Sequence, residues 1–342
     1  MKEVFFVTFP FFALVLAGFW ATYRSILPLT AIAGMNAYVL YFALPCLLFR
    51  FGASTPIANL LDPVTMTIYL CVGLCIVGLS VKLALRKNNS WADASLGALV
   101  AAFPNSGFMG VPLLVALFGA TAAGPVIQTV MIDMILTSSI CIALSQLGNA
   151  QHLSLQSSLV KAIKGVFSNP MPWSIGAGML VSASRVWIPE ASQQQALLQL
   201  QPIAKTIGLL ADSASPVALF TIGAVLARAQ LQQNEVQKAS QNGSKTVYKT
   251  SSWSDAAPVA FIKLFLHPIL LLLALLLAKQ LGFVIADFTA TVLVCVAALP
   301  SASNVSLLAE RFGADNGRIA RIIMLSTAIA FISFSALVAF YK

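Results

Sequence analysis

Two short runs place prolines, glycines and small polar residues inside strongly apolar segments. The run from Phe103 to Pro112 holds two prolines and two glycines, and a second run begins at Pro300. Proline removes a backbone donor and clashes with the carbonyl one turn back, while glycine tolerates unwound backbone. Each run therefore predicts an interrupted helix. We predict substrate contacts from Pro104, Asn105, Ser106, Pro300, Ser301, Ser303 and Asn304.

Interrupted helices in a membrane free backbone N–H and C=O groups that lipid cannot satisfy, so the irregular backbone must be buried in protein or line a wet cavity. The N-termini of half-helices carry partial positive charge and unpaired N–H groups, which suit an anion such as a carboxylate. Two breaks at matching positions favour a transporter's binding site. The alternative is a pair of proline kinks that only bend structural helices.

Ionisable residues inside apolar segments are a second source of chemistry because their burial is costly. Asp133, Asp212 and His267 are candidates for coupling to H⁺ or Na⁺, and Lys263 lies four residues before His267 on the same helix face. The alternatives are a neutral, hydrogen-bonded structural acid for Asp133 and a satisfied core histidine for His267.

A further pair of prolines lies in the matching pattern PxxLFxxG. Pro45 and Phe49 form one copy, and Pro216 and Phe220 form the other. These residues either wall the substrate cavity or only shape and pack their helices. Arg50 either reaches the substrate or extends to the membrane surface.

Composition defines the environment in which these residues work. Of 342 residues, 59% are hydrophobic and 9% are charged, whereas a soluble domain has about 25% charged residues. This excludes a water-soluble enzyme and a nucleic-acid-binding domain, in spite of the net charge of +9. No catalytic or cofactor motif is present, and all five cysteines lie in apolar runs, so we expect no enzyme activity, cofactor or metal site.

The elements that must position these residues are membrane-spanning helices, each about 20 apolar residues long. Ten are expected, at about 4–22, 30–50, 64–85, 94–118, 126–147, 169–187, 203–227, 257–279, 284–310 and 318–341. Twelve Lys and Arg residues fall in the loops on one side and four on the side of the termini. The excess of positive charge on cytoplasmic loops predicts that both termini lie outside the cytoplasm. The expected location is the plasma (cytoplasmic or inner) membrane.

Internal similarity organises these spans into two halves. Pro10 to Gly18 matches Pro170 to Gly178, the PxxLFxxG copies match, and Phe118-Gly119-Ala120 matches Phe312-Gly313-Ala314. Five spans repeated once form an inverted repeat, because an odd number reverses the second copy. The prediction is all-α: a first repeat over 1–147, a cytoplasmic connector over 148–168, and a second repeat over 169–342 with a flexible cytoplasmic loop at 228–256.

The sequence resembles the auxin efflux carrier family in three places. These are the run FPNSGFMGVPLL at 103–114, the run ALPSASNVSLLAERFGA at 298–314 and the PxxLFxxG pattern that contains Pro216 and Phe220. That family includes plant PIN-type carriers and bacterial malate or malonate permease-like members, and the chain is more similar to the bacterial ones. With the ten expected spans numbered 1 to 10 in chain order, the resemblance implies a scaffold of spans 1, 2, 6 and 7 and a transport domain of spans 3–5 and 8–10. It also implies that spans 4 and 9 cross at Pro104 and Pro300, that the transport domain moves like an elevator, and that the protein forms a homodimer.

The predicted function is therefore a secondary transporter or facilitator for a small organic anion, such as malate, malonate or an auxin-like acid. Its expected partners are this carboxylate and the lipid bilayer, with H⁺ or Na⁺ as the coupling ion. Competing hypotheses are a Na⁺-coupled carrier like the bile-acid/sodium symporters, a channel, and a membrane receptor that does not transport.

Overall fold

The computed structural model describes residues 2–56, 60–148, 170–184, 199–241 and 253–341, which form helices joined by turns and short irregular segments. Seven helical stretches there are long and apolar enough to cross a membrane: Phe5–Tyr23, Ala31–Ser54, Pro63–Arg86, Ala120–Ser145, Gln201–Gln232, Asp255–Gln280 and Asn316–Tyr341. Trp91–Ala102, Ser106–Phe118 and Asp287–Ala297 are shorter apolar helices. The expectation of an all-α integral membrane protein is confirmed at this level.

The first half of the chain forms α1 (Lys2–Tyr23), α2 (Ala31–Tyr38), α3 (Leu44–Ser54), α5 (Pro63–Arg86), α6 (Trp91–Ala102), α7 (Val111–Phe118), α8 (Ala123–Ile132) and α9 (Ser138–Ser145). The second half forms α11 (Pro170–Ser184), α13 (Gln201–Gln241), α14 (Trp253–Phe261), α15 (His267–Gln280), α16 (Asp287–Ala297), α17 (Val305–Arg311) and α18 (Asn316–Tyr341). Turns of π-helix join several of these: η1 (Val39–Ala43), η2 (Ser106–Gly110), η4 (Asp133–Thr137) and η6 (Ile262–Leu266).

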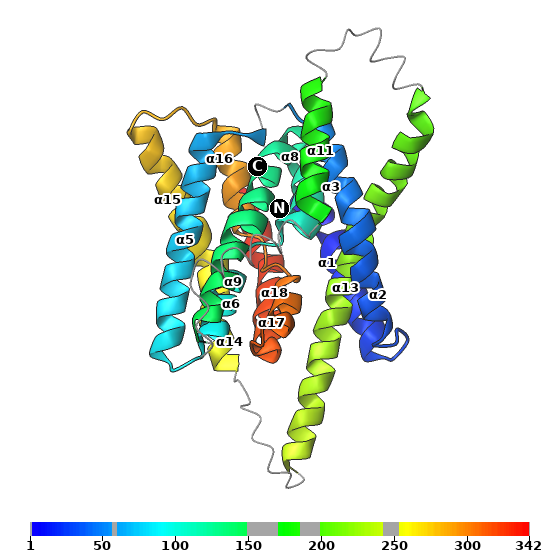
Figure 1. Cartoon of the computed structure of the whole chain (residues 1–342), viewed down its shortest axis with the longest axis vertical. Helices are drawn as coiled ribbons and strands as arrows, with labels where there is room; N and C mark the ends of the chain where they lie inside the picture. The colour runs from blue at the N-terminus through cyan, green and yellow to red at the C-terminus, as the bar shows by residue number, and fades with distance from the viewer. Residues whose placement is uncertain (1, 57–59, 149–169, 185–198, 242–252, 342) are drawn as a thin grey trace.

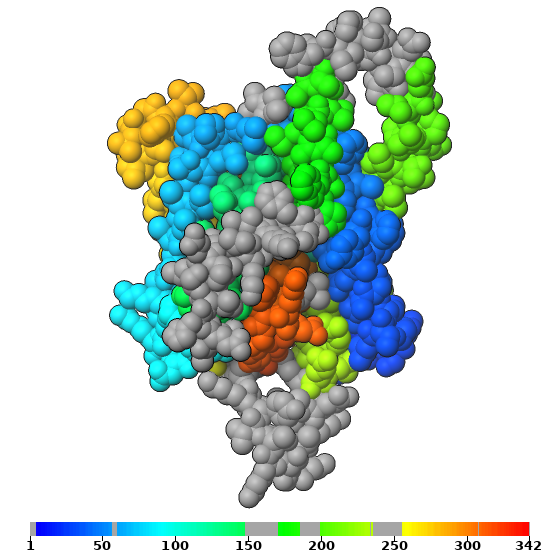
Figure 2. All heavy atoms as spheres, viewed as in Figure 1, coloured from blue at the N-terminus to red at the C-terminus, as the bar shows by residue number. Residues whose placement is uncertain are grey.

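The helices gather into two groups (Figure 1). One group contains α1, α2, α3, α11 and α13, and α5, α6, α9, α14, α15 and α16 belong to the other. The space-filling view shows the same division, with α5 and α15 on one flank and α3, α11 and α13 on the opposite flank (Figure 2). The division into scaffold and transport helices that the family resemblance implies stays a prediction.

Glycines that match between the repeats hold the first group together. A Cβ added to Gly18 of α1 would collide with the Phe220 carbonyl of α13, and one added to Gly178 of α11 would lie 2.6 Å from the Phe49 carbonyl of α3. Gly18 corresponds to Gly178 in the repeat, and Phe220 corresponds to Phe49. The pairs α1 with α13 and α11 with α3 therefore pack through equivalent contacts, with backbones brought close by small residues.

The boundary predicted for the long loop needs correction. We expected a flexible loop over 228–256, but α13 continues to Gln241 and α14 begins at Trp253. The segment 228–241 contains no Gly or Pro, and five of its residues are Gln, which is tolerated well in a helix. The rest of the loop and connector residues 149–168 lie outside the described residues.

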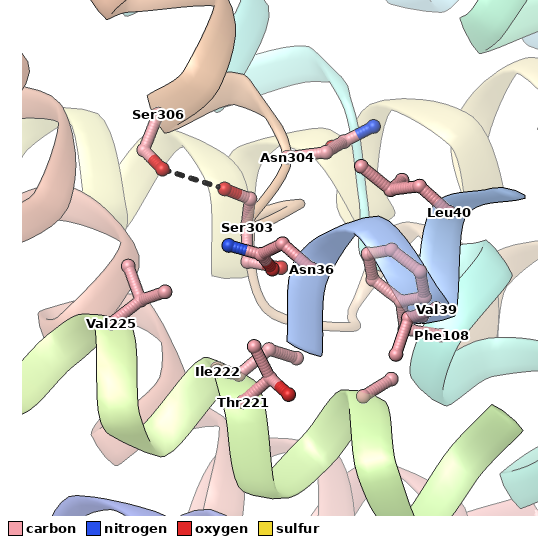
Figure 3. A pocket seen from close by; sticks show the side chains of 11 residues that line it. Asn36, Val39, Leu40, Phe108, Thr221, Ile222, Val225, Ser303, Asn304 and Ser306 are labelled. Carbon is pink, nitrogen blue, oxygen red and sulfur yellow. Dashed lines mark hydrogen bonds between the residues drawn. The ribbon is translucent and has the colours of Figure 1, made fainter. Parts of the chain in front are cut away.

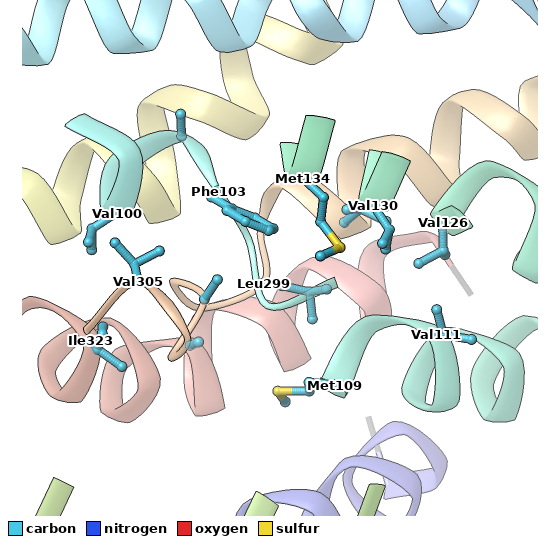
Figure 4. Close-up of a cluster of buried hydrophobic side chains, with 14 of the residues drawn as sticks. Val100, Phe103, Met109, Val111, Val126, Val130, Met134, Leu299, Val305 and Ile323 are labelled. Atoms are coloured by element: carbon cyan, nitrogen blue, oxygen red, sulfur yellow. The ribbon is translucent and has the colours of Figure 1, made fainter. Parts of the chain in front are cut away.

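The largest cluster of buried apolar side chains surrounds the two interrupted helices (Figure 4). Phe103 and Leu299 lie on the irregular segments themselves, and Val130 and Met134 come from α8 and η4. All four side chains are buried. Tight apolar packing thus fixes the path of chain segments that helical hydrogen bonds no longer hold.

A candidate substrate site at two interrupted helices

The two proline-containing breaks lie against each other. The Asn105 amide donates to the Pro300 carbonyl at 2.8 Å, and the Ala302 amide donates to the Phe103 carbonyl at 3.0 Å. Pro104 and Ser301 form the antiparallel pair between these two bonds. Proline has no N–H, so neither break can continue its own helix there, and each completes the other's backbone instead.

Each break then returns to helix in a different way. After the first, Ser106–Gly110 forms a π-turn, and the Asn105 carbonyl accepts from the amides of Met109 and Gly110. After the second, α17 begins at Val305, and the Ser301 amide donates to the Ser326 hydroxyl of α18 at 3.2 Å. A side chain of α18 therefore supplies the acceptor that the interrupted helix has lost.

Two small cavities flank this crossing of chain segments. The first, with a free volume of about 20 Å³, is lined by Leu44, Phe103, Pro104, Asn105, Gly107, Phe108, Val130, Met134, Met171, Ala302 and Asn304. The second, with a free volume of about 10 Å³, is lined by Asn36, Val39, Leu40, Phe108, Ala218, Thr221, Ile222, Val225, Ser303, Asn304 and Ser306. Figure 3 shows the second cavity between α13, α2 and the segment leading into α17.

Asn304 and Phe108 line both cavities, and several polar atoms there have spare hydrogen-bonding capacity. Asn304 Oδ1 and Ser301 Oγ are buried without a hydrogen-bond partner. The Ser106 hydroxyl donates weakly to the Pro104 carbonyl at 3.4 Å. The described linings contain no charged residue, so an anion bound here would depend on amides, hydroxyls and helix ends.

The structure places the predicted substrate residues close together, although their binding role remains a prediction. Pro104 and Asn105 line the first cavity, Ser303 lines the second, and Asn304 lines both. Ser106, Pro300 and Ser301 belong to the paired breaks.

The coupling candidates lie in two different environments. Asp133 is buried in η4, where its carboxylate accepts from Tyr69 Oη at 2.7 Å and Thr137 Oγ1 at 3.1 Å. Asp212 is exposed and pairs with Arg50 across α13 and α3, with Nη1 2.6 Å from Oδ1. The Arg50 guanidinium therefore contacts this carboxylate, and neither residue lines the two cavities.

His267 is buried beside Lys263, as its spacing predicts. Lys263 Nζ lies 3.4 Å from His267 Nδ1 and donates to the Ala297 carbonyl at 2.6 Å. When Lys263 is an ammonium group it can only donate, so Nδ1 then accepts and Nε2 carries the imidazole proton. That Nε2 atom is buried without a partner.

The predicted cavity wall is shifted along its helices. Pro45, Phe49, Pro216 and Phe220 line neither cavity, whereas Leu44 lines the first, and Ala218 and Thr221 line the second. Phe49 and Phe220 instead present their backbone carbonyls to the close-packed glycines. The packing alternative thus describes the contacts of these two residues.

Sequence reasoning missed Asn36, Thr221, Tyr69 and Ser326. Asn36 and Thr221 line the second cavity, Tyr69 bonds Asp133, and Ser326 bonds the second break. A single polar residue in an apolar span was the available signal for Asn36. For hydroxyl residues this signal is weak, because they often bond the carbonyl one turn back in their own helix, as Thr221 also does with Val217 at 2.6 Å.

Interrupted helices that meet inside an apolar bundle are typical of membrane transport proteins. Residues 4–338 match the model of a family described as membrane transport protein, and the chain belongs to this family, the auxin efflux carrier family. The chain is also 25% identical over 336 residues to a Rhizobium meliloti (strain 1021) protein described as a "putative malonate transporter". That match covers 96% of this chain and 93% of the relative. These findings indicate a transporter rather than an enzyme.

Proposed function

We propose that this protein is a secondary transporter or facilitator that moves a small organic anion across the cytoplasmic membrane by alternating access. The observation that carries the proposal is the pair of backbone hydrogen bonds joining Phe103–Asn105 to Pro300–Ala302. The two half-helices and their free polar atoms meet there, inside the bundle. Such discontinuous helices are typical of transporter binding sites.

The chemistry of the two cavities favours a small carboxylate. The side-chain amides of Asn105 and Asn304 and the Ser303 hydroxyl can donate hydrogen bonds to a carboxylate, and the helix that begins at Ser106 directs its positive end toward the break. In this conformation each cavity has room for about one water molecule, so a carboxylate would enter only with the helix movement that alternating access supplies. The description of the Rhizobium meliloti relative makes malonate the first substrate to test, with malate and an auxin-like acid as alternatives.

The architecture we propose has ten spans in two inverted repeats of five. The matched glycine contacts of Gly18 and Gly178 and the matched breaks at Pro104 and Pro300 support it. In this arrangement α1, α2, α3, α11 and α13 form the scaffold, and the other helices form a transport domain that moves as an elevator. We further propose a homodimer through the scaffold and both termini outside the cytoplasm.

The test is uptake by purified protein in liposomes, with malonate, malate, indole-3-acetate and a bile acid as substrates. Each is measured with and without proton and sodium gradients. Saturable uptake of one small carboxylate is the expected result. Uptake that does not saturate would identify a channel, and binding without uptake would identify a receptor; either result contradicts the proposal.

A further inference from the structure

The exposed side of α5 carries two basic residues near its C-terminal end. Lys82 and Arg86 are exposed and lie four residues apart, on the same helix face as the exposed Leu79 and Leu83. Because α5 is apolar and long enough to span a membrane, this exposed face contacts lipid. The two cations therefore lie where α5 passes from the hydrocarbon into the headgroup region.

An open groove with a free volume of about 630 Å³ runs beside this face. Its lining includes Gly78, Lys82 and Arg86 of α5, Trp91 at the start of α6 and Leu144 of α9. The three α5 residues follow each other at intervals of four, so they form a row of about 12 Å along the helix. A Cβ added to Gly78 would meet nothing within 4 Å. The groove is therefore open and apolar at one end and basic at the other.

Neither cation of the groove has a counter-ion in the part of the chain that the structure describes. The neighbouring Lys87 pairs with Asp255 at 3.9 Å, whereas the ion pairs there include neither Lys82 nor Arg86. Asp93, the next acid along the chain, already accepts hydrogen bonds from two other groups. Like charges four residues apart repel each other on a helix. An anion that contacts both cations would remove this repulsion.

The groove has the features that recognise a phospholipid rather than a soluble anion. A phosphate matches the two cations, and tryptophan, here Trp91, is typical of the headgroup level of a membrane. The apolar end beside Gly78 and Leu144 has room for an acyl chain, which a soluble anion lacks. The distribution of Lys and Arg predicts that this end of α5 is cytoplasmic, and basic pockets between helices on that side bind anionic headgroups.

We propose that the groove between α5, α6 and α9 binds one anionic phospholipid, with its phosphate at Lys82 and Arg86 and an acyl chain along Gly78. The inference goes beyond the proposed transport function and requires only that the protein lies in a membrane. The bound lipid joins α5 to α6, and α6 ends at Ala102, directly before the first break. It therefore stabilises the helix that leads to the substrate site.

The first experiment adds lipids with identical acyl chains to the purified protein in detergent. Native mass spectrometry measures binding, and thermal unfolding measures stability. Phosphatidylglycerol should bind and raise the melting temperature by several degrees, whereas phosphatidylcholine and glycerol phosphate should do neither. Equal binding of the two lipids would overturn the proposal. Equal binding of glycerol phosphate would identify a site for a soluble anion and would also overturn it.

The second experiment removes the charges. Lys82→Gln and Arg86→Gln should each weaken phosphatidylglycerol binding about fivefold, and the double variant about thirtyfold. Arg24→Gln is the matched control, because Arg24 is an exposed basic residue directly after α1. It should leave the affinity unchanged. A double variant that binds as wild type does, or a control that loses as much affinity as the double variant, would overturn the proposal.

The third experiment fills the apolar end of the groove and keeps both charges. Gly78→Phe should weaken phosphatidylglycerol binding and leave the melting temperature without lipid unchanged, because its Cβ meets no neighbour. Gly34→Phe is the control, since Gly34 of α2 is also exposed and also has no atom within 4 Å of an added Cβ. Unchanged affinity in Gly78→Phe would overturn the placement of the acyl chain. Neither readout uses a transported substrate, so a failure of malonate uptake leaves these tests intact.

Discussion

The glycine-packed pairs α1 with α13 and α3 with α11 contrast with the polar region around the two breaks. In the pairs, helix backbones touch directly, and Gly18 and Gly223 leave no room for a side chain. In the polar region, backbone groups leave their helices, and polar atoms such as Asn304 Oδ1 have no partner. The glycine-packed pairs are suited to a rigid part of the protein. The polar region around the breaks has atoms that can still bind a substrate.

This contrast also explains how similar sequence signals acquire different meanings. Proline occurs in both regions: Pro216 lies inside the continuous helix α13, whereas Pro300 follows the end of α16. At Pro216 the helix α13 continues without interruption and packs closely against α1. At Pro300 a second broken chain supplies the missing hydrogen bonds. The neighbouring segment, more than the proline itself, determines whether a helix bends or ends.

The largest effect on stability should come from a substitution between the glycine-packed helices α1 and α13. In Gly223→Ala the new Cβ would collide with the Val15 carbonyl of α1. We expect a loss of about 3 kcal/mol or more, because backbone atoms must move apart. Thermal unfolding in detergent measures it. Gly176→Ala is the matched control, since its Cβ meets nothing within 4 Å; equal stability of both variants would refute the packing argument.

Asn105→Ala tests the polar region without disturbing the frame. The side chain lines the first cavity, while the backbone amide makes the bond to Pro300. Malonate affinity should fall about tenfold, as expected for a lost hydrogen bond of about 1.4 kcal/mol in a buried site. The melting temperature should stay close to wild type. Unchanged affinity would remove Asn105 from the site.

Asp133→Asn tests whether the buried carboxylate carries a coupling proton. The amide cannot exchange a proton in the working pH range, so any pH dependence of uptake should disappear. Uptake is measured in liposomes at a series of external pH values. Asp212→Asn is the control, because that carboxylate is exposed and paired with Arg50. A retained pH profile in Asp133→Asn would assign Asp133 a structural role.

The smallest effect is expected from Ser326→Ala. This change removes the acceptor for the Ser301 amide and should lower stability by about 1 kcal/mol. Ser333→Ala is the control, because its hydroxyl bonds only within its own helix, to the Ile329 carbonyl at 3.2 Å. Thermal unfolding compares the two. Equal changes would mean that the bond to the break contributes little.

Features set by local chemistry could be predicted from the sequence. Hydropathy predicted the helices, and Pro104 and Pro300 predicted where two of them are interrupted, because the lack of an N–H is a property of the residue itself. The continuation of α13 to Gln241 was also a local feature. We missed it because a polar composition was interpreted as a loop in spite of its helix-forming residues.

Only the tertiary structure decided which groups meet. Tyr69 and Asp133, Lys263 and Ala297, and Ser301 and Ser326 are pairs from different elements. Their hydrogen bonds depend on how helices pack, which residue type and spacing do not specify. The sequence by itself determined an apolar helical chain with interruptions at Pro104 and Pro300 and with matching glycines at Gly18 and Gly178. The fold determined that the breaks complete each other and that Lys263 donates to the Ala297 carbonyl, because an interrupted helix must find its partners elsewhere in the chain.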